Sequence, residues 1–279
     1  MGEVREKMEK DSTFILDAGA ATAGAVIGAV VAGPAGAVGG AAVGAVVQSA
    51  VQWIGNEIKN RHLAKSEEKK IGTVYELAWQ KVNANLEAGK ATRSDDFFTE
   101  KGEERSAATE ITEEVFFAAQ RESEEKKLPY LSNLYANILF DDTVDKPMAV
   151  QLLKIAEQLT FRQIQTLSIL GGFQLATEST GYQPLKTEGY KAISGYKNIS
   201  IATETFALYQ QGLIQSKSAF FDPASIIPAN LSLVGCGALL YNLMELSTLP
   251  FDSYSPEIIH FLSDKVIVEM TPQRMALKK

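Results

Sequence analysis

Residues 18–50 read AGAATAGAVIGAVVAGPAGAVGGAAVGAVVQSA, an uncharged stretch that lies between Asp17 and Glu57. It is built almost wholly from Ala, Gly and Val, although each glycine in a helix costs about 1 kcal/mol relative to alanine. Gly33-Pro34 interrupts the run, and proline suits the first turn of a new helix because its missing N–H would be unpaired there. The sequence therefore predicts a helical hairpin, with one helix near 18–32 and another from about 35 to 60.

The glycines of this stretch are spaced four residues apart. Gly24 and Gly28 form one row, and Gly36, Gly40 and Gly44 form a second. Residues four apart share a helix face, so each row would leave a groove that another backbone can approach closely. Membrane helices associate in this way, because no hydrophobic effect drives them together in lipid. We interpret the two rows as packing surfaces of membrane helices.

A tight soluble hairpin or a disordered arm would fit the same residues. The charged segment MGEVREKMEKDSTFILD precedes the run and excludes a secretory signal peptide. The run exceeds the roughly 20 residues that cross a bilayer, but alanine and glycine are only weakly lipophilic. We favour a segment that enters a membrane in at least one state.

The rest of the chain has an ordinary globular composition. Of its 279 residues, 46% are hydrophobic and 22% are charged, and the net charge is −7. An acidic balance argues against a protein that coats duplex DNA through a general basic surface. The single cysteine, Cys236, rules out an intramolecular disulfide and fits a small core residue.

Apolar spacing predicts a mostly helical body after the hairpin. We expect helices over 56–92 and, with a break at RESEEKK, over 103–140. Thr160 and Gln163 fit a capping box, which predicts a helix from there through Leu170 that ends at Gly171-Gly172. A helix over 201–213 should stop at Gly212, and IIPANLSLVGCGALLYNLM predicts a short extended segment followed by a helix.

These patterns divide the chain into three domains. Residues 1–60 form the glycine-rich segment, residues 61–159 a helical oligomerisation body, and residues 160–279 a sensor domain. In the sensor domain, GLIQS and the later IIPANLSLVGCGALLYNLM resemble the end of a winged-helix unit, which implies a small winged-helix-like α/β part. The expected fold class is therefore mostly α.

A tyrosine- and lysine-rich stretch is the best candidate for ligand binding. Within residues 181–198, Gly-Tyr recurs three times with lysines close by. Aromatic rings and ammonium groups suit single-stranded nucleic acid, because bases stack on rings and phosphates meet lysines. A surface loop with inward-packed tyrosines is the more ordinary interpretation, and we favour it. If a ligand binds here, the candidate residues are Tyr182, Lys186, Tyr190, Lys191, Tyr196 and Lys197.

No pattern in the chain indicates catalysis. The acids Glu110, Glu113 and Glu114 fit a solvated helix face. His62 and His260 lie in no nucleophile pattern, and the chain has no phosphate-binding loop or dinucleotide fingerprint. We therefore expect no enzyme, no cofactor and no metal site.

The stretch EEKKLPYLSNLYANILFDDTVDKPMAVQLLKIAEQLTFRQIQTLSIL resembles the bacterial Abi-alpha (abortive infection alpha) family. That family has an acidic helix, a motif like L-x-x-L-x-A-x-I-L, a polar turn and a further helix. The resemblance covers about residues 100–245, and it implies a role in anti-phage defence by membrane damage. The glycine-rich segment ahead of a helical sensor also resembles the effector of Hailong-type systems, which implies silencing by a DNA oligomer from a partner nucleotidyltransferase.

Together these observations predict a switchable membrane effector. We expect a homo-oligomer, most simply a tetramer, that is cytoplasmic when inactive and enters the inner membrane when active. A short DNA oligomer is the candidate ligand. The alternatives are a winged-helix DNA-binding regulator and a non-toxic membrane-anchored scaffold.

Overall fold

A computed structural model describes residues 63–102, 104–180, 185–189, 196–218 and 221–263. The predicted glycine hairpin and its rows (Gly24, Gly28, Gly36, Gly40 and Gly44) lie outside these residues. His62, Tyr182, Tyr190 and Lys191 also lie outside them.

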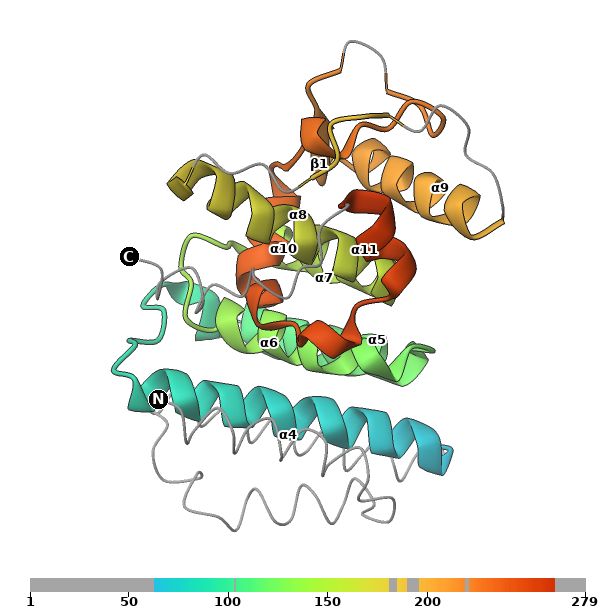
Figure 1. The fold of residues 1–279 in the computed structure, drawn as a ribbon. Helices are drawn as coiled ribbons and strands as arrows, with labels where there is room; N and C mark the ends of the chain where they lie inside the picture. Colours follow the sequence, from blue (N-terminus) through green and yellow to red (C-terminus); the bar gives the residue numbers. More distant parts are fainter. Residues whose placement is uncertain (1–62, 103, 181–184, 190–195, 219–220, 264–279) are drawn as a thin grey trace. The chain divides into compact units, whose positions relative to one another are not determined.

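The described chain is mostly helical, which confirms the expected fold class at that level (Figure 1). It contains eight α-helices and one small antiparallel sheet of two strands. The α-helices are α4 (Lys65–Glu87), α5 (Ala107–Arg121), α6 (Leu128–Ile138), α7 (Lys146–Gln158), α8 (Phe161–Thr180), α9 (Tyr196–Gln210), α10 (Cys236–Leu243) and α11 (Pro256–Leu262). The strands are β1 (Ile214–Ser216) and β2 (Leu231–Leu233), and the 3-10 helices are η2 (Asp96–Phe98), η3 (Glu125–Lys127), η4 (Pro228–Asn230), η5 (Leu246–Thr248) and η6 (Phe251–Ser253).

The chain divides into two compact units, Met1–Glu157 and Gln158–Lys279. The division falls close to the expected boundary at 159/160, and the roles assigned to the three expected domains stay predictions.

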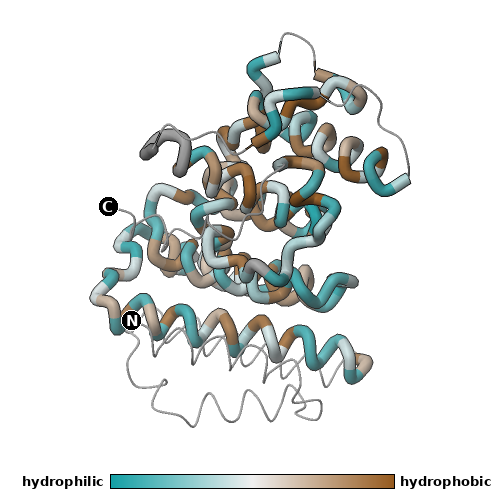
Figure 2. Tube along the Cα trace, in the orientation of Figure 1, coloured by the Kyte–Doolittle hydropathy of each residue, from teal (hydrophilic) through white to brown (hydrophobic). Residues whose placement is uncertain are grey.

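In the first unit, α4 packs against α5 and α6 (Figure 1). Hydrophilic and hydrophobic residues alternate along α4 as the helix turns (Figure 2). Its apolar positions Val74 and Ala78 are buried, as are Val115 of α5 and Leu131 and Leu134 of α6. Residues three and four apart share a face, so this spacing turns one side of each helix inward and builds the core of the unit.

A buried ion pair lies where α5 gives way to α6. Lys127 Nζ lies 2.5 Å from Glu122 Oε2, and the two side chains are only 2% and 5% exposed. The same Nζ donates to the carbonyl of Glu157 in α7 at 2.8 Å. Lys70 of α4 donates to the carbonyl of Glu122 at 2.6 Å. The break at RESEEKK is therefore confirmed. The contacts of Glu122 and Lys127 connect the end of α5 to α4 and α7.

Arg93 is a second buried cation of this unit. Its side chain is 0% exposed and pairs with Asp95, and its Nη1 donates to the carbonyls of Ile138 at 3.2 Å and Val144 at 2.9 Å. The guanidinium also lies over the Phe97 ring, 3.8 Å from the ring centre. Hydrogen bonding by Arg93 lowers the pKa of the Asp95 carboxyl.

In the second unit, α8 packs against β2, α10 and α9. Thr160 and Gln163 form the predicted capping box. Gln163 N donates to Thr160 Oγ1 at 3.1 Å, and Thr160 N donates to Gln163 Oε1 at 2.9 Å. The start of α8 is therefore confirmed.

The predicted end of that helix is wrong. Instead of stopping at Gly171-Gly172, α8 continues to Thr180. A Cβ atom at Gly171 would overlap the Tyr241 ring of α10 and the side chain of Leu233 in β2. Glycine at this position therefore allows close packing within a continuous helix and does not end it.

Glycine does end α4 and α9. Gly89 and Gly212 have φ values of +79° and +69°. At the end of α9, Gly212 N donates to Tyr209 O at 2.9 Å and Leu213 N donates to Leu208 O at 3.0 Å. Both bonds satisfy carbonyls that the last turn leaves unpaired, as in the Schellman motif. The predicted stop at Gly212 is confirmed.

A short hairpin follows α9. Strands β1 and β2 pair antiparallel, with Ile214 opposite Leu233 and Ser216 opposite Leu231. Ile214, Leu231 and Leu233 are buried, so the hairpin is held on the unit by its apolar side chains. Helix α10 begins directly after β2.

Candidate functional site

The structure describes three of the six predicted ligand-binding residues. Tyr196 is the first residue of α9 and is 94% exposed. Lys197 follows it in the helix, and Lys186 lies in the short described segment 185–189. The favoured interpretation, a loop tyrosine that packs inward, is therefore wrong for Tyr196. The setting of the two lysines decides what else the region can do.

Lys186 connects its own segment to two other parts of the second unit. Its Nζ donates to the carbonyl of His260, and its backbone N donates to the carbonyl of Leu262 at 2.9 Å. Its own carbonyl accepts from Ala229 N at 2.9 Å. The residue therefore fixes its segment against the end of α11 and against η4, which is a structural role.

Lys197 forms an ion pair across two helices. Its Nζ lies 2.6 Å from Glu257 Oε1 in the first turn of α11. Helix α11 begins at a Ser255 cap, whose Oγ accepts from Ile258 N at 3.3 Å. The hydrogen bond from Lys197 is the largest cause of a lowered pKa for the Glu257 carboxyl. A phosphate group would have to compete with this carboxylate for Lys197.

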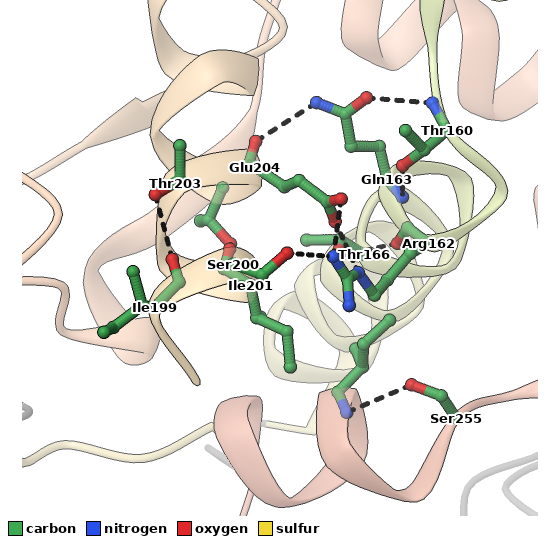
Figure 3. A network of polar contacts seen from close by, with 12 residues as sticks. Thr160, Arg162, Gln163, Thr166, Ile199, Ser200, Ile201, Thr203, Glu204 and Ser255 are labelled. Atoms are coloured by element: carbon green, nitrogen blue, oxygen red, sulfur yellow. Dashed lines mark hydrogen bonds and ion pairs between the residues drawn. The ribbon is translucent and has the colours of Figure 1, made fainter. Parts of the chain in front are cut away.

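Arg162 is the centre of a neighbouring polar network (Figure 3). Its Nε and Nη2 donate to the two carboxylate oxygens of Glu204, each at 2.6 Å, and Nη2 also donates to Ser200 Oγ. Gln163 Nε2 donates to the backbone carbonyl of Glu204 at 3.2 Å. The start of α8 is therefore joined to the middle of α9 by a two-pronged ion pair and an amide hydrogen bond.

Neither Arg162 nor Glu204 was predicted as part of a site. Arg162 lies inside the predicted capping box, and Glu204 lies 42 positions away in another helix. No spacing in the sequence indicates that they meet. The only signal in the sequence is that each is the single charge of its predicted helix, Arg162 in residues 160–170 and Glu204 in residues 201–213.

Taken together, α8, α9 and α11 bring two cations and two anions into ion pairs. Arg162 faces Glu204, Lys197 faces Glu257, and the positive charge of Arg162 also helps to lower the pKa of Glu257. The cluster is electrically balanced. It positions α9 firmly, and it would bind an added anion only by releasing a carboxylate.

Three acids singled out by the sequence, Glu110, Glu113 and Glu114, lie in α5. Glu110 pairs with Lys146 at 2.6 Å and Glu113 with Arg105 at 2.5 Å, while Glu114 is exposed. The predicted role of these three acids as a surface helix face fits their positions.

Ser168 belongs to a buried polar group of the second unit. Its Oγ bonds to the carbonyl of Leu246 and to the hydroxyl of Tyr254, and burial raises the pKa of Tyr254. These contacts satisfy polar atoms that the fold has removed from water.

Among the described residues, no group of three or more His, Cys, Asp or Glu side chains is arranged to hold a metal ion. His260 is exposed near the end of α11, and Cys236 is half-buried at the start of α10. None of the helices in the described ranges combines the length and apolar character that a membrane span needs.

Comparisons with known proteins find no relative of this chain. No protein-family model, no curated protein and no solved structure matches it.

Proposed function

We propose that the protein is a membrane-disrupting effector of a bacterial abortive-infection system. The observation that carries the proposal is the uncharged run 18–50, with glycine rows at Gly24 and Gly28 and at Gly36, Gly40 and Gly44. Small residues four apart let membrane helices approach closely. Residues 1–60 would form the membrane-active segment, and the two helical units would form the body that assembles and controls it.

Within the described residues, the first unit has a packed core of its own. Side chains of α4, α5 and α6 bury one another, and Lys127 and Arg93 bond to carbonyls of the described chain. The proposal requires that the body keep this packing while the segment moves from the protein to the inner membrane.

The proposed active form is a homo-oligomer, most simply a tetramer built by residues 61–160. Two short helices from one chain cannot line a pore, so several copies must contribute. The same protein would be cytoplasmic when inactive. The resemblance of residues 100–245 to the Abi-alpha family agrees with this proposal, and neither activity nor assembly requires an enzymatic step.

Control by a short DNA oligomer is the proposed regulation, with the site at residues 181–198. The exposed Tyr196 ring supports it, because an exposed ring can stack on a base. Tyr182, Tyr190 and Lys191 would complete the site. Lys197 would contribute only after exchanging Glu257 for a phosphate, since the two are already paired.

The decisive experiment compares two leucine substitutions in the full-length protein expressed in bacteria. Gly40→Leu should fill the groove of the second glycine row and abolish the loss of membrane potential, measured with a potential-sensitive dye. Ala42→Leu adds a similar side chain half a helical turn away and should leave leakage intact. Equal leakage in wild type and in Gly40→Leu and Gly36→Leu variants would refute the proposal.

A winged-helix DNA-binding regulator is the second candidate. The succession of α9, the β1–β2 hairpin and α10 favours it, because such units place a hairpin directly after a recognition helix. The charges of α9 count against it, since Lys197 and Glu204 are both paired within the protein and duplex binding relies on cations that reach phosphates. Salt-dependent binding of duplex DNA by the full-length protein would favour the regulator.

A further inference from the structure

The solvent-facing side of α9 carries large apolar residues. Tyr196, Ile199, Thr203 and Phe206 follow one another at spacings of three or four residues, so they lie on one face. Tyr196 is 94% exposed and Ile199 is 49% exposed. The opposite side of α9, which includes Ile201, is buried. Thr203 is exposed and Phe206 is half-buried. We call Tyr196, Ile199, Thr203 and Phe206 the outer face of α9.

An aromatic cluster extends this outer face towards the end of the helix. Tyr209 is 40% exposed, and its ring centre lies 4.6 Å from that of Phe221 and 6.2 Å from that of Phe206. Contiguous exposed apolar groups of this kind mark interaction surfaces more often than isolated ones do. The cluster and the outer face together form one candidate contact surface.

The outer face is uncharged. Helix α9 contains only two charged residues, Lys197 and Glu204, and each is paired with another helix of the same unit, Lys197 with Glu257 and Glu204 with Arg162. The hydroxyl of Thr203, in the centre of the face, donates to the carbonyl of Ile199 at 2.9 Å. Burial of this face would therefore leave neither a charge nor the Thr203 hydroxyl without a partner.

We propose that the outer face of α9 packs against the same face of a second copy of this chain. A nucleic acid along the whole face would need cations that reach phosphates, and the single cation of α9 is paired. Only Tyr196, at the end of the face, is shared with the proposed DNA site, so a bound oligomer and a second copy would compete for that residue. Copies with a net charge of −7 repel one another, so a contact between copies is favoured where the surface is neutral. A neutral, apolar face satisfies this condition for self-association.

The geometry points to an antiparallel pair around a two-fold axis. In such an interface, residue i of one copy contacts residue j of the other and the reverse. Helix α9 runs from Tyr196 to Gln210, and Thr203 lies at its midpoint. A two-fold axis at Thr203 places the smallest side chain of the face where the helices cross, and it brings Ile199 of each copy towards the Phe206 end of the other.

Single cysteines test this pairing in the full-length protein, in a Cys236→Ser background. Thr203→Cys lies on the proposed axis, so a short bis-maleimide should link two copies efficiently. Tyr196→Cys should link poorly, because two such residues would lie ~21 Å apart along antiparallel helices. Asn242→Cys, an exposed residue of α10, is the control and should give only background. The products are separated on a denaturing gel at micromolar protein concentration.

The pattern of cross-links decides the outcome. Efficient linking at Thr203→Cys with little at Tyr196→Cys supports antiparallel pairing. Equal linking at both positions would indicate a parallel contact, and linking at neither above the Asn242→Cys background would leave the face unoccupied by a second copy. Either result overturns the proposal. Protection of Thr203→Cys from alkylation by a short DNA oligomer or by lipid vesicles, without any dimer, would do so as well.

A charge substitution gives a second test. Phe206→Glu should lower the solution mass of the assembly measured by light scattering, whereas Asn242→Glu should not. Thermal unfolding of both variants checks that the fold is kept. Because neither test measures membrane damage, a wild-type mass in Phe206→Glu would refute this pairing and leave the membrane proposal standing, and a failure of the membrane proposal would leave this pairing intact.

Discussion

Two lysine–carboxylate pairs, one in each unit, have nearly the same geometry and very different surroundings. The Nζ–O distance is 2.5 Å between Lys127 and Glu122 and 2.6 Å between Lys197 and Glu257. The side chains of the first pair are 2% and 5% exposed, and those of the second pair are 77% and 39% exposed. Distance alone would rank the two pairs as equals.

The two pairs differ in burial, and burial determines what the loss of one partner costs in stability. A buried ion pair that loses one partner leaves an uncompensated charge in a medium of low polarity, which is strongly destabilising. An exposed pair that loses one partner exchanges it for water, at little net cost. The comparison indicates that Lys127 is a structural element of the first unit, whereas Lys197 can change partners at little cost. The Arg162–Glu204 pair, 33% and 23% exposed, lies between these extremes.

The largest effect is expected from Lys127→Met. This change should lower the free energy of unfolding by about 3–5 kcal/mol, because it leaves Glu122 charged and buried. It also removes the donor to the Glu157 carbonyl. Guanidinium unfolding followed by the fluorescence of the buried Trp79, in a Trp53→Phe background, reports on this unit.

Lys126→Met is the matched control, because Lys126 is the exposed neighbour and its loss should matter little. Adding Glu122→Gln to Lys127→Met should recover part of the loss, since no charge then stays buried. A Lys127→Met protein as stable as the Lys126→Met protein would show that burial does not distinguish the two pairs.

An intermediate effect is expected from Arg162→Met. The guanidinium holds both oxygens of Glu204 at 2.6 Å, and partial exposure reduces what this pair contributes, so we expect a loss of about 1–2 kcal/mol. Thermal unfolding in the same buffer measures it. Arg162→Lys keeps the charge without the two-pronged geometry and should fall between Arg162→Met and the wild type. Full stability in Arg162→Lys would mean that charge alone matters.

The smallest effect is expected from Lys197→Met, and it should depend on pH. Because Lys197 lowers the pKa of Glu257 in the folded protein, this pair stabilises the fold above the unfolded pKa of Glu257. That contribution is lost as the pH falls through the lowered, folded pKa. The variant should therefore match the wild type in strong acid and show a slightly shallower rise in melting temperature towards neutral pH.

Lys217→Met removes another exposed lysine of the same unit and serves as the control. It should keep the pH dependence of the wild type. Parallel pH profiles for wild type and Lys197→Met would mean that the pair with Glu257 does not persist in solution.

Local signals in the sequence predicted local structure well. The capping box at Thr160 and Gln163 and the stop at Gly212 depend on residues a few positions apart, and both are confirmed. The predicted stop at Gly171 failed because its reason is non-local. Nothing near Gly171 in the sequence indicates that Tyr241, from a later helix, will pack against it.

The candidate site shows the same limit. Composition singled out Tyr196 and Lys197, but the partner of Lys197 is Glu257, 60 positions away. The Arg162–Glu204 pair likewise joins two helices that only the fold brings together. Sequence spacing can show that a residue type suits a ligand, whereas the charge that already neutralises it is a property of the folded chain.

The backbone conformation of the glycines that end α4 and α9 suits amino acids of the opposite chirality. Gly89 and Gly212 adopt positive φ, the region that L-amino acids avoid and their mirror images prefer. For both positions the space around an added Cβ is empty, so an L-alanine there would meet only backbone strain. A D-alanine introduced by chemical synthesis would suit the backbone and restrict the unfolded chain, which stabilises a fold by about 0.4–1 kcal/mol. At these two helix ends, the fold is better matched to an amino acid that the ribosome does not supply.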